Sequence, residues 1–150
     1  IELNESAVRA LFEELGVEPK IEGHGRLLKY SVENLIVYVG DFFALTSTDV
    51  GDIDGVFDRG ALVALPEQIR SKYSEHLQIV SNTKKQFVVT YDYDQGLFAG
   101  PPFSVTSETI HQAYQNNYHI TQLYRGKIAG GFRAQDEVYE GVYLLLNKRG

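Results

Sequence analysis

Residues 55–66 have the sequence GVFDRGALVALP, and this stretch decides the fold class. Its first residues suit a short strand that ends at Asp58-Arg59. Pro66 suits the first turn of a helix that runs to about Val80. The next strand, at 86–91, ends in the acidic run 92–94. A strand, a helix and a second strand in this order predict a parallel pair of strands joined by a helical crossover.

The flanking segments extend the alternation of strands and helices. Residues 4–15 are the clearest helix, because apolar side chains recur at the helical spacing and Gly16 suits a left-handed stop. The remaining elements are expected as strands at 26–30, 35–39, 118–124 and 138–146 and a helix at 107–116. The strand at 35–39 is apolar throughout, which is typical of burial on both faces. We expect an α/β fold with one mostly parallel sheet, helices on both faces, and an antiparallel pair of the last two strands at one edge.

The composition narrows the function classes. The chain has 150 residues, which is enough for one domain over 1–150 and for a sizeable core. Cysteine is absent, which excludes disulfides, thiolate metal sites and cysteine nucleophiles. The net charge of −6 argues against a nucleic-acid partner. No apolar run is long enough to span a membrane, so we expect a cytoplasmic protein, monomeric and without a membrane partner.

The start of the chain is unusual. Methionine is absent and the sequence begins at Ile1. Residues 1–5 suit the end of a strand that runs directly into a helix cap. We therefore expect the domain to be incomplete at its N-terminus, with one strand–helix unit upstream.

Acids follow several of the predicted strands, where open α/β sheets bind their ligands. Glu2 suits the carboxylate that holds ribose hydroxyls, or a surface acid near a helix start. Asp41 and Phe42 suit the two sides of an adenine, or a helix cap followed by a core phenylalanine. Asp58 and Arg59 suit a surface ion pair, or an arginine that binds the substrate.

The sequence gives little support for a metal site, a phosphate-binding site or a serine–histidine–acid catalytic site. The four histidines show no metal-ligand spacing, and no phosphate-binding loop or serine–histidine–acid arrangement can be argued. Asp92 and Asp94 suit either proton acceptors or solvated strand ends.

Five segments together closely resemble the thiopurine S-methyltransferase family, especially its bacterial members. In chain order they are ELNE at 2–5, GDFFAL at 40–45, FDRGALVALP at 57–66, YDYDQ at 91–95 and GPPFSV at 100–105. The third and fifth segments are highly specific. The similarity runs from Ile1 to about Val105 and resumes at 142–145.

This resemblance implies a class I, Rossmann-like methyltransferase fold that binds S-adenosylmethionine. It implies that Glu2 binds the cofactor ribose, and that Asp41 and Phe42 line the adenine. Arg59 would lie where cofactor and acceptor meet. The acceptor side is implied to contain Pro101, Pro102 and Arg133. The family's glycine-containing loop for the methionine end of the cofactor is not in this sequence.

The implied reaction is methyl transfer to a thiol, a thiopurine or a related soft nucleophile, which includes selenite and tellurite. Such a displacement needs positioning and a deprotonated acceptor more than a side-chain nucleophile. A neighbouring arginine favours a thiolate by its charge. The alternatives are a halide or thiol methyltransferase of the same broad group, and a non-catalytic binding module of this fold.

Overall fold

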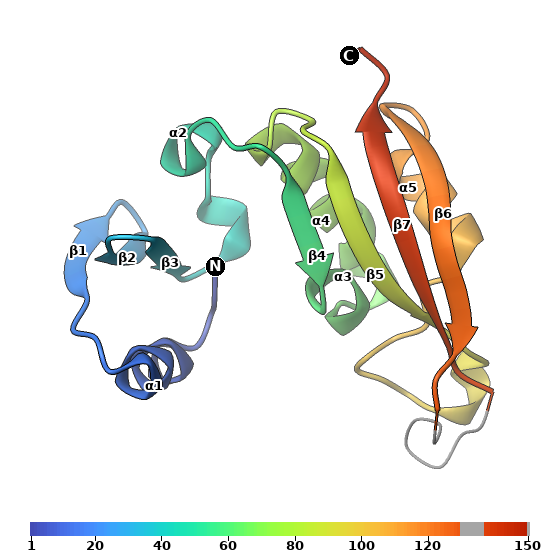
Figure 1. The fold of residues 1–150 in the computed structure, drawn as a ribbon, viewed down its shortest axis with the longest axis horizontal. Coiled ribbons are helices and arrows are strands. Elements are labelled where there is room, and N and C mark those ends of the chain that lie inside the picture. The colour runs from blue at the N-terminus through green and yellow to red at the C-terminus, as the bar shows by residue number, and fades with distance from the viewer. Residues whose placement is uncertain (130–136, 150) are drawn as a thin grey trace. The chain divides into compact units, whose positions relative to one another are not determined.

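The computed structural model describes residues 1–129 and 137–149 (Figure 1). Its contacts divide the chain into two compact units, residues 1–49 and 50–150, and each unit is described by itself. The expectation of one domain over 1–150 stays a prediction. Every helix within the described ranges is too short or too polar to cross a lipid bilayer.

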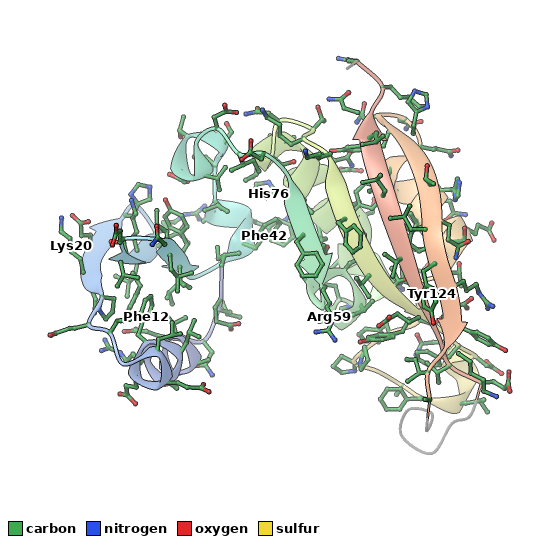
Figure 2. The ribbon with its side chains drawn as sticks, in the orientation of Figure 1. Phe12, Lys20, Phe42, Arg59, His76 and Tyr124 are labelled. Carbon is green, nitrogen blue, oxygen red and sulfur yellow. The ribbon has the colours of Figure 1, made fainter. Side chains whose placement is uncertain are left out.

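The first unit packs one helix against a small antiparallel sheet. Its elements are α1 (Glu5–Leu15), β1 (Lys20–His24), β2 (Leu27–Val32), β3 (Leu35–Val39), η1 (Phe42–Ala44) and, at the boundary of the unit, α2 (Ser47–Val50). The strand order is β1-β2-β3. Helix α1 begins where Asn4 accepts the N–H of Ser6 at 3.0 Å and ends at Gly16, whose φ is 67°. Phe12 lies between α1 and the sheet, where it packs with Tyr30 (Figure 2).

The first unit differs from the sequence expectations in two ways. Strand β1 was not predicted, because its residues are mostly exposed and show no alternation of apolar and polar side chains. Strand β3 is buried on both faces only at its end. Val39 on the face toward α1 and Tyr38 on the other face are buried, whereas Ile36, on the same face as Tyr38, is 52% exposed. An unbroken apolar sequence does not say which face a neighbouring element covers.

The second unit contains a four-stranded sheet in the order β4-β5-β7-β6. Its elements are β4 (Val56–Arg59), α3 (Ala61–Ala64), α4 (Glu67–Val80), β5 (Gln86–Asp92), η2 (Gln95–Leu97), α5 (Ser107–Tyr114), β6 (Tyr118–Lys127) and β7 (Tyr139–Asn147). The expected antiparallel pair of the last two strands is confirmed at one edge of this sheet. Pro66 immediately precedes α4, close to the predicted start.

The expected mostly parallel sheet is wrong. Strands β4 and β5 are parallel, but β7 is antiparallel to both of its neighbours, β5 and β6. Strand β6 therefore runs in the same direction as β4 and β5, as the helical crossovers require. The alternation of helices and strands predicts the directions of these strands. It does not predict which strands are neighbours in the sheet, because β7 inserts between β5 and β6.

Helices α4 and α5 lie on one face of this sheet, so the expectation of helices on both faces is wrong for the described residues (Figure 1). The open face carries aromatic side chains. Phe57 and Phe87 are paired across β4 and β5, with ring centroids 5.8 Å apart and exposed fractions of 66% and 37%. On the helix face, Val88, Ile110 and Leu145 are fully buried and form part of the core.

Candidate functional site

The structure brings together two of the predicted site residues in the first unit, Glu2 and Asp41. Glu2 forms an isolated parallel bridge with Val39. The N–H of Glu2 donates to the carbonyl of Tyr38, and the N–H of Gly40 donates to the carbonyl of Glu2, both at 2.9 Å. The two chain segments run in the same direction, so Glu2 and the residues that follow β3 lie at one edge.

Each of these carboxylates is oriented by a backbone amide. Glu2 Oε1 accepts the N–H of Asn4, and Asp41 Oδ1 accepts the N–H of Phe43, both at 2.9 Å. Both side chains are exposed. The described residues provide no hydrogen-bond partner for Glu2 Oε2 or Asp41 Oδ2. One oxygen thus fixes each carboxylate, and the other faces solvent, where it can accept a hydrogen bond from a ligand.

Asp41 is also the cap of η1, so the cap that one interpretation expected is confirmed. A cap and a binding role are compatible here, because they use different oxygens of the same carboxylate. Phe42 follows directly as the first residue of η1 and is half-buried rather than part of the core. Its ring meets that of Phe43 edge-on, with centroids 5.7 Å apart.

Asp58 and Arg59 lie on opposite faces of β4, as successive strand residues must. Asp58 is 3% exposed; it accepts the N–H of Leu62 at 3.2 Å and the O–H of Tyr73 at 2.9 Å. Burial raises the pKa of Asp58, against the effect of these hydrogen bonds. The interpretation of Asp58 and Arg59 as a surface ion pair is therefore wrong.

Arg59 ends β4 as an exposed side chain (Figure 2). No acidic group of the described residues lies within ion-pair distance of it. Its guanidinium is therefore available to a ligand. This position agrees with an acceptor-binding arginine.

We call residues 100–103 the proline loop. It contains Pro101, which is exposed, and Pro102, which is half-buried. The N–H of Phe103 donates to the carbonyl of Val63 at 2.6 Å, and the hydroxyl of Tyr93 donates to the carbonyl of Pro102 at 2.7 Å. The first contact joins the loop to the segment that follows Arg59. The second unit thus brings the two predicted parts of the acceptor side to the same end of the sheet.

The remaining candidate residues are placed as follows. Arg133 lies outside the described residues. Arg125, at the end of β6, pairs with Asp92 at 2.9 Å and stacks over the ring of Tyr139 at 3.9 Å. Asp92 is therefore held in an ion pair rather than free to accept a proton. Asp94 caps η2 by accepting the N–H of Gly96.

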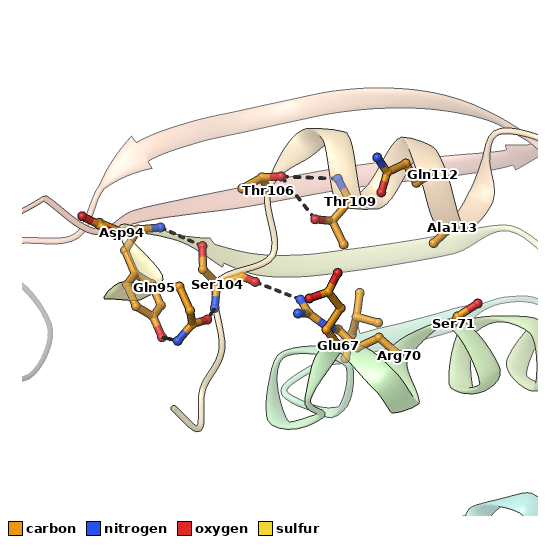
Figure 3. A pocket seen from close by; sticks show the side chains of 12 residues that line it. Glu67, Arg70, Ser71, Asp94, Gln95, Ser104, Thr106, Thr109, Gln112 and Ala113 are labelled. Atoms are coloured by element: carbon orange, nitrogen blue, oxygen red, sulfur yellow. Dashed lines mark hydrogen bonds between the residues drawn. The ribbon is translucent and has the colours of Figure 1, made fainter. Parts of the chain in front are cut away.

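Sequence reasoning missed a cavity of about 580 Å³ between α4 and α5 (Figure 3). Arg70, Gln95 and Ser104 line it, and no sequence motif marks them because they come from three separate segments. It also missed the pair of His24 and Asp49, whose Nε2 and Oδ1 atoms are 2.5 Å apart. The ranges 1–129 and 137–149 contain no group of three histidine or acidic side chains that could hold a metal ion.

The comparisons with known proteins agree with the sequence motifs. The family profile described as thiopurine S-methyltransferase matches residues 1–148. The chain belongs to this family. Its prediction from the sequence motifs is therefore confirmed, and the family supports a methyltransferase enzyme. The mixed α/β structure agrees with the methyltransferase fold at this coarse level.

Bacterial relatives named thiopurine S-methyltransferase match most of the chain. That of Xanthobacter autotrophicus is 42% identical over 144 residues, which are 96% of this chain and 68% of the relative. That of Teredinibacter turnerae is 40% identical over 145 residues, 97% of this chain and 68% of the relative. That of Acinetobacter baylyi is 40% identical over 127 residues, 82% of this chain and 58% of the relative.

Proposed function

We propose that the protein transfers a methyl group from S-adenosylmethionine to the sulfur of a small thiol, with thiopurines as test acceptors. Selenite and tellurite belong to the same class of soft nucleophile and are further candidate acceptors. The observation that carries the proposal is the pair of exposed carboxylates, Glu2 and Asp41, at adjacent segment ends in a chain of the thiopurine S-methyltransferase family.

The residues of the first unit fit the nucleoside part of the cofactor. A ribose presents two neighbouring hydroxyl donors, and Glu2 has one carboxylate oxygen fixed and one facing solvent. Adenine presents an exocyclic amine and an aromatic face. Asp41 offers an acceptor for the amine, and the half-buried ring of Phe42 follows it directly in the chain. In the proposal, these three residues hold the cofactor by its nucleoside.

The residues of the second unit fit the acceptor. When bound, S-adenosylmethionine supplies an electrophilic methyl group. The exposed guanidinium of Arg59 attracts an anionic acceptor and favours its thiolate over its thiol. The proline loop supplies an apolar wall with Pro101 and Pro102, which orients a flat acceptor ring and keeps water away from it. No side-chain nucleophile is needed for a direct displacement.

The cofactor part is tested by calorimetric titration of the full-length protein with S-adenosylmethionine. Glu2→Gln should weaken binding about tenfold or more, because a hydrogen bond to a charged group contributes roughly 1.5–3 kcal/mol. Glu14→Gln is the matched control, since Glu14 is an exposed acid of α1 in the same unit. Absence of binding by the wild type, or equal affinities of the two variants, would refute the cofactor assignment.

The acceptor part is tested by assays with 6-mercaptopurine, selenite and tellurite. Arg59→Ala should lower kcat/KM for the thiopurine about tenfold or more and leave the Kd of S-adenosylmethionine unchanged. Arg26→Ala is the matched control, because Arg26 lies in the turn between β1 and β2. Transfer to none of the three acceptors would sink the enzyme proposal. An unchanged kcat/KM in Arg59→Ala would remove Arg59 from the site.

A further inference from the structure

The proline loop has no regular structure of its own, so its shape depends on what holds its backbone. It lies between η2 and α5. Besides the Phe103–Val63 hydrogen bond, side chains from other segments bind backbone carbonyls at its last residues and directly after it. The hydroxyl of Tyr93 reaches the carbonyl of Pro102, and Arg70 Nη1 donates to the carbonyl of Ser104 at 2.8 Å.

A third side chain, Gln95, links these contacts. Its Oε1 accepts the N–H of Ser104 at 2.8 Å, and its Nε2 donates to the hydroxyl of Tyr93 at 3.2 Å. The Tyr93 hydroxyl thus receives one hydrogen bond and gives another. Hydrogen bonds in such a chain polarise and strengthen one another. The loop end is held as one connected network rather than by separate contacts.

Arg70 is an unusual choice for a purely structural contact, because partly burying a guanidinium costs free energy. Burial lowers the pKa of its guanidinium, which means that the charged form is partly desolvated. Its Nε is buried and has no hydrogen-bond partner in the described part of the chain. A buried polar atom without a partner destabilises the fold and calls for an explanation. The guanidinium of Arg70 donates a hydrogen bond to the carbonyl of Ser104, and this contact accounts for its place in the fold (Figure 3).

Arg70 holds the backbone directly after the loop from the side of the cavity. It lines the cavity between α4 and α5, which neither proline lines. We propose that Arg70, with Tyr93 and Gln95, is a positioning residue that fixes the proline loop for the acceptor. This inference rests on the proposed function, because it uses the acceptor role of the loop. Arg70 acts through the backbone of Ser104 and does not touch the acceptor.

The test uses the full-length protein and three readouts. They are hydrogen exchange of the amides at 103–105, the KM and kcat for 6-mercaptopurine, and the calorimetric Kd of S-adenosylmethionine. In Arg70→Met, exchange at 103–105 should become about tenfold faster while exchange in β4 and β5 is unchanged. The KM for the thiopurine should rise about tenfold, and the Kd should stay within about twofold.

Two further variants separate positioning from general stability. Arg70→Lys keeps a charged donor and should recover part of the KM. Tyr93→Phe removes only the hydroxyl, and its effect on KM should be less than additive with that of Arg70→Met, because both residues hold one loop. Gln112→Ala is the control, since Gln112 lines the same cavity but bonds Glu108 instead of the loop. It should change none of the readouts.

The outcomes discriminate between the two proposals. A wild type that methylates no acceptor refutes the proposed function, and the acceptor role of the loop with it. An active wild type whose Arg70→Met variant shows unchanged exchange, or faster exchange with an unchanged KM, overturns the positioning role. An equal loss of cofactor affinity and acceptor affinity in Arg70→Met also overturns it, because that pattern reports a general loss of structure.

Discussion

Replacing Tyr73 with phenylalanine removes one buried hydroxyl and nothing else. That hydroxyl donates to Asp58 Oδ2 at 2.9 Å, and both residues are buried, with exposed fractions of 7% and 3%. The second oxygen of Asp58 accepts the N–H of Leu62 in α3. The variant therefore leaves a buried carboxylate without its side-chain donor, and only the backbone N–H groups of Leu62 and Ala61 still bind it.

The expected loss follows from the chemistry of this contact. A buried hydrogen bond to a charged group contributes about 1.5–3 kcal/mol, and its unsatisfied partner stays desolvated. We expect Tyr73→Phe to lower the free energy of unfolding by about 2 kcal/mol, or the Tm by roughly 4–8 °C for a chain of this size. Asp58→Ala should cost more, because it removes the carboxylate that accepts from the Tyr73 hydroxyl and from the backbone amides of Leu62 and Ala61.

Urea unfolding of the wild type, the two single variants and the double variant gives the pairwise coupling energy. We expect a coupling of about 1–3 kcal/mol. Tyr139→Phe is the matched control, because Tyr139 also donates to a carboxylate, that of Glu137, at 2.7 Å, but at the surface, where water can replace the lost partner. A Tyr73→Phe loss no larger than that of the control, or additive single effects, would refute the reasoning.

Three further predictions concern titration and a glycine. Burial raises the pKa of Asp58, so the contribution of this group to the free energy of unfolding is fully present below its unfolded pKa and is lost as pH rises through its folded pKa. Unfolding measured from about pH 4 to 7 should therefore show Asp58→Asn becoming more stable relative to the wild type as pH rises. A difference in stability that stays constant with pH would contradict this. The hydrogen bond from His24 helps to lower the pKa of Asp49 to about 2, so the stabilisation by the Asp49 carboxylate is present above its unfolded pKa and is lost as pH falls toward 2. Carboxyl NMR of His24→Ala should show the pKa of Asp49 moving up. An unmoved titration midpoint would exclude the contact. Gly100 has a φ of 82°, and an added Cβ would lie 2.6 Å from the Phe103 ring, so Gly100→Ala should lose more stability than Gly51→Ala, which has a φ of 69° and open space; equal Tm losses would argue against the close approach.

Local signals in the sequence predicted the local structure well. Helix α1 ends at Gly16, the left-handed stop that the sequence predicts, because this signal acts within one helical turn. The strand ends predicted at Val39 and at Asp58-Arg59 agree with the ends of β3 and β4. These features depend on residues that are close together in the chain.

Other features could not be predicted because they depend on distant pairing or burial. The insertion of β7 between β5 and β6 is set by contacts across the sheet, and nothing in the helix–strand alternation specifies it. Arg70 and Ser104 are 34 residues apart. The adjacent charges of Asp58 and Arg59 suggest an ion pair in the sequence. In the structure they are separated, because successive residues of a strand point to opposite faces of the sheet.

The alternation along β4 has a consequence for how this family could vary. Asp58 serves the interior of the second unit, whereas Arg59, one residue later, faces solvent. In the proposed function Arg59 meets the acceptor, so the demands of folding and those of acceptor binding fall on adjacent positions, which share no side-chain partner among the described residues. Selection can therefore change acceptor preference at Arg59 with little effect on stability. A change at Asp58 would destabilise the fold, and selection would remove it whatever its effect on acceptor preference.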